Sequence, residues 1–153
     1  MSKNKRSQRL APILKLALHE EQEAAKKLES ALSGVHKQEQ HLGELLCYQK
    51  EYLQRFAGFV QQEQAIGRLR SYKGFLDNLA LGIVRQKEII VQAKNFYDTQ
   101  RSVWLEKCSR SRSLTKVSEQ HRRSEESARE RTVQRTQDEH SGRHRPVGNK
   151  GGN

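Results

Sequence analysis

The chain has 153 residues, of which 33% are hydrophobic and 31% are charged, so it is too polar to fill the core of a compact globule of that size. Its formal net charge of +11 favours an anionic partner, which could be nucleic acid, a membrane surface or an acidic protein. No apolar run is long enough to span a bilayer, and no apolar stretch follows the basic N-terminus as it would in a signal peptide. We therefore expect an elongated cytosolic protein that buries a narrow apolar stripe.

Residues 1–12 form a basic arm with four Lys or Arg residues and no acidic residue. Proline occurs only at Pro12 and Pro146, near the two ends of the chain. The sequence from Ile13 to Arg145 can therefore be helical without a proline break. We expect the first helix to begin at residue 13.

The segment 13–61 carries a heptad pattern that begins with Leu14 at position a. Counted on to residue 66, twelve of the sixteen a and d positions are apolar or aromatic, in one register. This repeat predicts a long coiled-coil helix. Further apolar residues occupy position e and widen the apolar stripe, which gives the helix a broad apolar face; they are Leu18, Ala25, Leu32, Leu46, Leu53 and Val60.

A turn is predicted at 62–71, with Gly67 as the helix breaker and Ser71 as the N-cap of the next helix. A connection this short makes the two helices antiparallel neighbours. The predicted fold class is therefore all-α, a long two-helix antiparallel coiled-coil hairpin. Glycines around the turn, Gly58, Gly74 and Gly82, allow either close packing or a soft surface that admits a partner.

The second helix is predicted over 72–140. Its register places an apolar or aromatic residue at each position a from Leu69 to Trp104. Beyond about residue 106 the apolar residues become sparse, so we expect the helix to continue there as a single polar helix. The last residues, 141–153, are expected to be a disordered tail.

No set of side chains in this sequence is typical of a catalytic or metal site. His36 and His41 are five residues apart, which does not place two ligands on one helix face, and His140 and His144 belong to the polar end. In the predicted hairpin Cys47 and Cys108 would lie about 30 Å apart, so both are expected to be free thiols, with Cys47 packed. We expect no enzyme activity, no metal and no cofactor.

The positive charge is concentrated at the two ends of the chain. Residues 13–100 carry twelve basic and eleven acidic residues, whereas 101–153 carry thirteen basic and seven acidic residues. An antiparallel hairpin would bring the two basic ends together. Acidic residues interleave with basic ones over 119–139 and no aromatic platform accompanies them, so we expect no nucleic-acid binding. The basic end is instead expected to dock on a protein through Lys3, Lys5, Arg6, Arg9, Arg110 and Arg112.

Three motifs occur in order along the hairpin. They read Tyr48-Gln-Lys-Glu-Tyr52, then Tyr72-Lys-Gly-Phe75 followed by Leu79, then Trp104-Leu-Glu-Lys107. Over about residues 8–120 the sequence resembles the flagellar export protein family FliJ. The resemblance implies a non-catalytic coiled coil of the bacterial flagellar type III export apparatus, similar to the central stalk of rotary ATPases.

The resemblance also implies partners and a location. They are the export ATPase FliI with its regulator FliH, the export gate protein FlhA, and export chaperones. The protein would be cytoplasmic and would reach the inner face of the cell membrane at the flagellar base only through these partners.

The resemblance places a gate-binding surface on the second helix, at Phe75, Leu79, Gly82 and Gln86. The sequence departs from the expected family pattern at Gly82 and Gln86, where alanine and histidine are expected. Tyr48 and Tyr52 match the first-helix motif. Tyr52 is a d residue and fits the hairpin core, whereas Tyr48 at position g fits an exposed contact.

Two other functions fit the sequence. One is the equivalent stalk of a virulence type III secretion system, which would have the same architecture with different neighbours. The other is a generic basic coiled coil that acts as a scaffold or binds nucleic acid.

Overall fold

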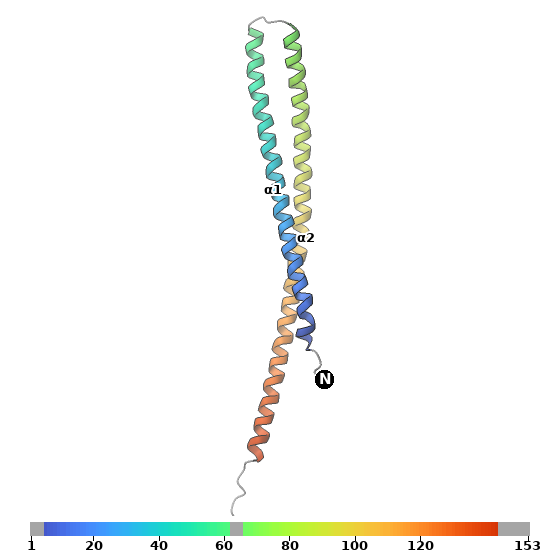
Figure 1. Cartoon of the computed structure of the whole chain (residues 1–153), viewed down its shortest axis with the longest axis vertical. Coiled ribbons are helices and arrows are strands. Elements are labelled where there is room, and N and C mark those ends of the chain that lie inside the picture. The colour runs from blue at the N-terminus through green and yellow to red at the C-terminus, as the bar shows by residue number, and fades with distance from the viewer. Residues whose placement is uncertain (1–4, 62–65, 144–153) are drawn as a thin grey trace, which may run out of the picture. The chain divides into compact units, whose positions relative to one another are not determined.

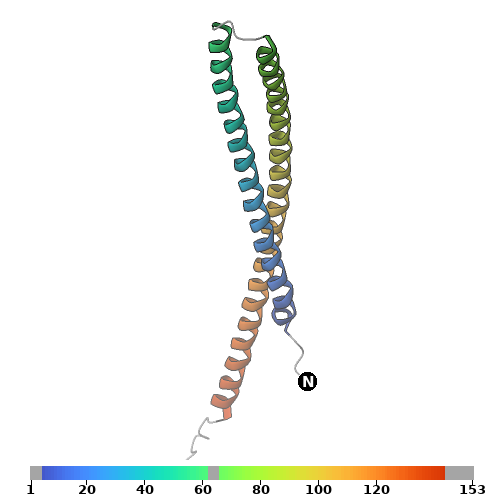
Figure 2. The ribbon, with the colours of Figure 1, turned by 45° about the horizontal axis from the view of Figure 1, so that its top comes forward.

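The computed structural model describes residues 5–61 and 66–143, which form two helices. Helix α1 comprises Arg6–Gln61 and helix α2 comprises Ile66–Arg143, with 56 and 78 residues respectively (Figure 1). The described residues contain no strand, and the two helices pack against each other in opposite directions (Figure 2). The predicted all-α antiparallel hairpin is confirmed.

The chain divides into two units, which we describe separately. The hairpin unit comprises residues 20–107. The terminal unit combines both ends of the chain, and its described residues are 5–19 and 108–143. No helix within the described ranges is long and apolar enough to cross a membrane.

The heptad register of the hairpin unit agrees with the prediction. Every described a and d side chain of both helices in this unit is buried or half-buried, except Ile66, which ends the first register and is exposed. The buried ones are small or β-branched for the most part, as in Ala24, Ala31, Val35, Ile83 and Ile90. The a and d positions therefore form the core of the hairpin.

The apolar residues at position e lie outside this core. Ala25, Leu32, Leu46 and Leu53 are all exposed. Two helices cover only the strip of side chains between them, and position e lies beyond that strip. The apolar surface of α1 is therefore wider than the surface that α2 covers.

The helix boundaries differ from the prediction at three points. Helix α1 begins at Arg6 rather than at residue 13, so Pro12 lies inside the helix. Helix α2 begins at Ile66, and Ser71 donates a hydrogen bond from Oγ to the carbonyl of Gly67 at 3.2 Å instead of capping the helix. Helix α2 extends to Arg143, so residues 141–143 of the predicted tail are helical, and 144–153 lie outside the described residues.

Helix α2 also does not become a single helix after residue 106. In the terminal unit Cys108, Ser111 and Ser118 are buried, and so is Ala17 of α1. The a positions of α2 simply change from apolar residues to serine, which is small enough to allow two helices to stay in contact. Only the segment 126–143 is exposed throughout.

Both cysteines are free thiols, but their environments differ from the prediction. Cys47 is exposed and Cys108 is buried. Cys47 occupies position f of the first register, which faces away from α2, whereas Cys108 lies next to the serine-rich seam of the terminal unit.

Candidate docking surfaces

An aromatic cluster lies near the turn of the hairpin unit. The ring centroid of Tyr52 is 4.6 Å from that of Phe75 and 6.0 Å from that of Tyr72, and Phe56 stacks on Tyr72 at 6.4 Å. A hollow of about 140 Å³ opens beside these rings, lined by Tyr52, Ser71, Tyr72 and Phe75. Tyr52, Phe56 and Tyr72 are half-buried a or d residues, so the cluster is part of the hairpin core.

Phe75 contributes to this cluster and is also accessible to a partner. Its side chain is 45% exposed, although it packs on Tyr52. Tyr48, one turn before Tyr52, is 54% exposed and faces away from the core. Tyr52 is therefore half-buried in the helix seam and Tyr48 is exposed, while a contact of either residue with a partner stays a prediction.

The four residues expected at the gate surface do not share one exposed face. Phe75 and Gly82 occupy position g, at the edge of the helix pair, whereas Leu79 and Gln86 occupy position d and point toward α1. Gln86 is only 4% exposed, and its side-chain amide donates hydrogen bonds to Gln38. Of the four, Phe75 alone is exposed, while Leu79 and Gly82 are half-buried.

The terminal unit contains the basic residues that were expected at a docking end. Lys5 directly before α1, Arg6 and Arg9 of α1, and Arg110 and Arg112 of α2 are all exposed there. Lys3 lies outside the described residues. Both basic segments of the sequence therefore belong to one unit.

The pairing of Ser7 with Glu125 sets which residues of α2 lie level with the start of α1. Ser7 Oγ donates a hydrogen bond to Glu125 Oε2 at 2.6 Å, and the Ser7 backbone N–H donates one to Oε1 at 3.2 Å. Residues next to Glu125 along α2 therefore flank the N-terminus of α1, whereas Arg110 and Arg112 lie about two heptads away. The arginines level with Lys5, Arg6 and Arg9 are Arg122, Arg123 and Arg129.

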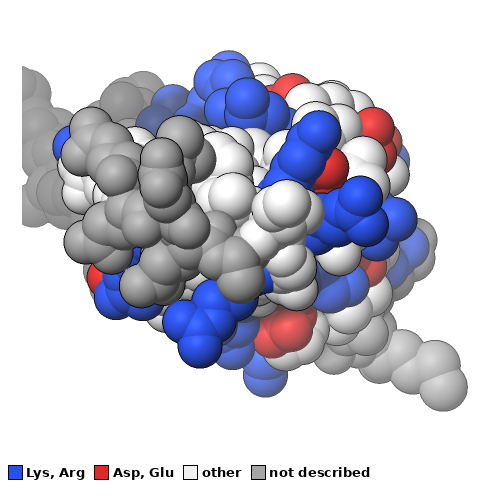
Figure 3. Space-filling model, turned by 90° about the horizontal axis from the view of Figure 1, so that it is seen from above, with Lys and Arg blue, Asp and Glu red and all other residues white. Residues whose placement is uncertain are grey.

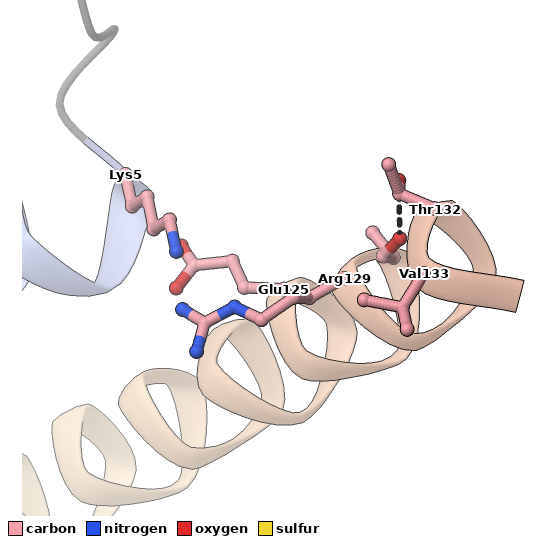
Figure 4. Close-up of a pocket in the computed structure, with 6 residues that line it drawn as sticks. Lys5, Glu125, Arg129, Thr132 and Val133 are labelled. Atoms are coloured by element: carbon pink, nitrogen blue, oxygen red, sulfur yellow. Dashed lines mark hydrogen bonds between the residues drawn. The ribbon is translucent and has the colours of Figure 1, made fainter. Parts of the chain in front are cut away.

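A hollow of about 380 Å³ lies at this end of the terminal unit (Figure 4). Lys5 and Arg129 extend toward the carboxylate of Glu125 at its edge, and Ala128, Thr132 and Val133 form the rest of the lining. Thr132 donates its hydroxyl to the carbonyl of Ala128 at 2.9 Å and so presents its methyl group. The hollow combines two cations with a short apolar floor.

Glu125 supplies the negative charge that the first turn of α1 lacks. The first turn of α1 contains no acidic residue, although the free N–H groups of a helix N-terminus favour a negative charge. The hydrogen bond from the Ser7 side chain is the main cause that lowers the pKa of Glu125, partly opposed by desolvation and supplemented by the Ser7 N–H, Lys5 and His121. A carboxylate from α2 thus caps the start of α1.

The sequence prediction missed Ser7, Glu125 and Arg129. Its register began at Leu14 because Pro12 was taken as the start of the helix. Counting one heptad back from Leu14 would have placed Ser7 at position a and identified the terminal pairing.

The charge of the two units differs sharply. The described residues of the terminal unit carry thirteen Lys or Arg and six Asp or Glu, whereas residues 20–107 carry thirteen and twelve. Figure 3, which looks onto the end where α1 ends and α2 begins, shows acidic side chains among the basic ones. The described residues contain no group of three or more His, Cys, Asp or Glu side chains that could hold a metal ion.

Comparison with known proteins identifies one family. A family model described as "Flagellar FliJ protein" matches residues 6–145, which is most of the chain. Neither the curated proteins nor the solved structures that were compared with the chain gave a match.

Proposed function

The chain belongs to the flagellar FliJ protein family, a component of flagellar type III export, and on this premise we propose that it is the non-catalytic stalk of that export apparatus. The terminal unit engages the ring of the export ATPase FliI, with its regulator FliH. The hairpin unit connects this ring to the export gate protein FlhA and escorts export chaperones. The protein then resides in the cytoplasm at the flagellar base and meets the membrane only through its partners.

The observation that carries this proposal is the separation of charge between the two units. An excess of seven positive charges belongs to the described part of the terminal unit, against one for residues 20–107. A concentrated positive charge accelerates association with an acidic surface. The terminal unit is therefore the unit that we expect to dock on an acidic partner. The near-neutral hairpin unit is suited to contacts that depend on exposed aromatic side chains, such as Phe75 and Tyr48.

The match to a flagellar family model favours flagellar export over the equivalent stalk of a virulence secretion system. It also favours a protein partner over nucleic acid, in agreement with the acidic residues that interrupt the basic segment 119–139. The generic scaffold is therefore the weaker alternative.

The ATPase contact can be tested by reversing charge in one unit at a time. We expect Arg122→Glu, Arg123→Glu and Arg129→Glu together to weaken binding of purified FliI at least tenfold, with a smaller salt dependence. The matched control reverses three exposed arginines of the hairpin unit, Arg68, Arg70 and Arg85, and should retain binding within about threefold. Equal losses in both variants, or no loss in either, would contradict the proposed orientation.

The gate contact requires a separate experiment. Phe75→Ala is expected to weaken binding of the FlhA cytoplasmic region while circular dichroism shows that helicity is kept. Gln86→Ala serves as a comparison, because Gln86 is buried and can affect the gate only by destabilising the hairpin. If Phe75→Ala leaves gate binding unchanged, the gate surface lies elsewhere.

A further inference from the structure

The hairpin unit exposes a row of leucines along one side of α1. Leu32, Leu46 and Leu53 occupy position e at steps of one or two heptads, and their side chains are 39%, 42% and 49% exposed. Leucines at heptad spacing lie on one side of a helix, and Leu46 and Leu53 are neighbours in this row, whereas Glu39 stands between Leu32 and Leu46. Helix α2 covers mainly positions a and d, so a large part of each of these leucine side chains is left exposed among the described residues.

The residue that interrupts this row shows which part of α2 lies beside it. Glu39, at position e between Leu32 and Leu46, pairs with Lys94 of α2 at 3.5 Å between Oε1 and Nζ. Lys94 is likewise an e residue of the second register, so the e positions of both helices line the same side of the hairpin. In an antiparallel pair, heptad steps run in opposite directions along the two helices.

This register places basic residues of α2 opposite the leucines of α1. The ring contacts of Tyr52 with Phe75 and of Phe56 with Tyr72 place Leu53 level with Lys73, Leu46 with Ala80 and Leu32 with Lys94, so that Glu39 reaches Lys94 diagonally. Lys87 and Arg101 occupy position e one heptad to either side of Lys94. Lys73, Lys87 and Arg101 are all exposed. One side of the hairpin unit therefore has a leucine edge and a basic edge that run parallel, although the unit as a whole is almost neutral.

We propose that this side of the hairpin unit, defined as the e-face, docks an amphipathic helix of another protein that carries an apolar stripe and an acidic flank. The apolar stripe of the incoming helix packs on Leu32, Leu46 and Leu53. Its acidic flank lies along Lys73, Lys87 and Arg101. The e-face is separate from Phe75 and Tyr48, which occupy position g on the other side of the helix pair.

The chemistry of the e-face selects this occupant. A third helix would complete a three-helix core, and the two-helix core is shallow, because no described side chain is less than 2% exposed. A second copy of this chain would bring one basic edge against another when the same faces meet, which like-charge repulsion opposes. An acidic flank instead meets the basic edge favourably, and the leucines give the contact its apolar area.

The direct probe is a synthetic helical peptide of four heptads with Leu at a and d and Glu at e and g. Its glutamates repel one another in a self-paired coiled coil, so it is available to bind. A second peptide has Lys in place of every Glu. Labelling the exposed Cys47 of the full-length chain with a fluorophore, while Cys108 stays buried, lets energy transfer report whether the peptide lies on the hairpin unit.

We expect the acidic peptide to bind and to give energy transfer from Cys47, and the Lys peptide to bind at least tenfold more weakly. Replacing Leu32, Leu46 and Leu53 together by Gln should weaken binding of the acidic peptide at least tenfold. The control variant replaces Ile89 and Phe96, exposed at position g, by Gln and should bind as the unmodified chain does. Both variants change exposed residues, one set on each side of the same hairpin. Circular dichroism checks that both remain folded, so that a difference in peptide binding can be assigned to the side that was changed.

Three outcomes would overturn the proposal. If the acidic peptide binds the leucine variant as tightly as the unmodified chain, it is bound by charge attraction to the basic terminal unit and not by the e-face. Stronger loss in the Ile89 and Phe96 variant would place the site at position g. Self-association of the chain, seen by sedimentation and removed by the leucine changes, would identify a second copy as the occupant. None of these outcomes depends on whether FliI or FlhA binds as proposed above.

Discussion

Gln86 of α2 donates its side-chain amide to both oxygens of Gln38 on α1, at 2.7 Å to Oε1 and at 3.0 Å to the main-chain carbonyl. Both residues occupy position d, where the neighbouring heptads have apolar side chains. A polar pair in an apolar seam is satisfied in one alignment of the helices only, because a slip by one heptad would leave both amides without each other. The pair therefore fixes the register that places the e-face and the aromatic cluster.

Removing one partner of this pair should destabilise the hairpin. Gln86→Ala is expected to lower the free energy of unfolding by about 1–2 kcal/mol, because two hydrogen bonds are lost at a buried position. Gln38→Leu combined with Gln86→Leu should instead raise it, since leucine packs in a d position, while alternative registers become populated. Urea denaturation followed by circular dichroism measures the first effect, and multiple NMR signals for residues 83–90 would reveal the second. A double variant that is less stable than the unmodified chain would contradict this interpretation.

Phe75 and Tyr48 should differ in their contribution to stability although both are exposed. Phe75→Ala is expected to lower the free energy of unfolding by about 1–2 kcal/mol, because it removes a ring contact with Tyr52 and part of the apolar burial. Tyr48→Ala should change it by less than about 0.5 kcal/mol. Thermal denaturation of the two variants makes the comparison. Similar losses for both would mean that Tyr48 also packs on the hairpin.

Gly82 should be replaceable by alanine with a gain in stability. An added Cβ at Gly82 meets no heavy atom within 4 Å, and the residue lies in the interior of α2. Gly82→Ala is therefore expected to raise the free energy of unfolding by about 0.5–1 kcal/mol. Gly43→Ala, which also has open space around it, is a matched control in α1. If Gly82→Ala destabilises the chain while Gly43→Ala does not, Gly82 makes a close contact with α1 that contradicts the open space described here.

The cap that Glu125 provides for α1 should depend on pH. Its pKa is lowered in the folded chain from the ordinary 4.5, mainly by the hydrogen bond from Ser7, so the deprotonated form is the one that folding favours. The stabilisation is then present above pH 4.5 and is lost as pH falls through the lowered pKa. Ser7→Ala should raise the Glu125 pKa toward its ordinary value, as NMR titration of the carboxyl carbon would show. Hydrogen exchange of the first turn of α1 should become faster in the same variant. A Glu125 pKa that does not move would exclude Ser7 as the main cause.

Much of the fold could be predicted from the sequence because a coiled coil repeats one local rule. The described a and d positions counted from Leu14 and Leu69 are buried or half-buried in the hairpin unit, apart from Ile66, with Gln38 and Gln86 among them. The same rule failed at the ends for local reasons. Pro12 was read as a helix boundary, although packing of residues such as Leu10 and Ser7 against α2 holds a helix that begins at Arg6.

The candidate sites were less predictable than the helices. Phe75 and Tyr48 were correctly expected to be accessible, whereas Gln86 turned out to be a core residue. The sequence motif places Phe75 and Gln86 in one group, but the heptad assigns them to positions g and d. Spacing along a helix therefore decides more about accessibility than membership of a motif.

The sequence by itself determined that this chain forms two helices, which residues face the seam and where the positive charge is concentrated, because periodicity and charge are properties of the local sequence. Only the tertiary structure decided that Gln38 meets Gln86, that Glu125 caps α1 and that Leu32, Leu46 and Leu53 remain uncovered beside a basic edge. These features depend on the alignment of two helices and on how much of each surface the other covers. A heptad pattern fixes the direction in which a side chain points, but only the packed pair shows what stands opposite it.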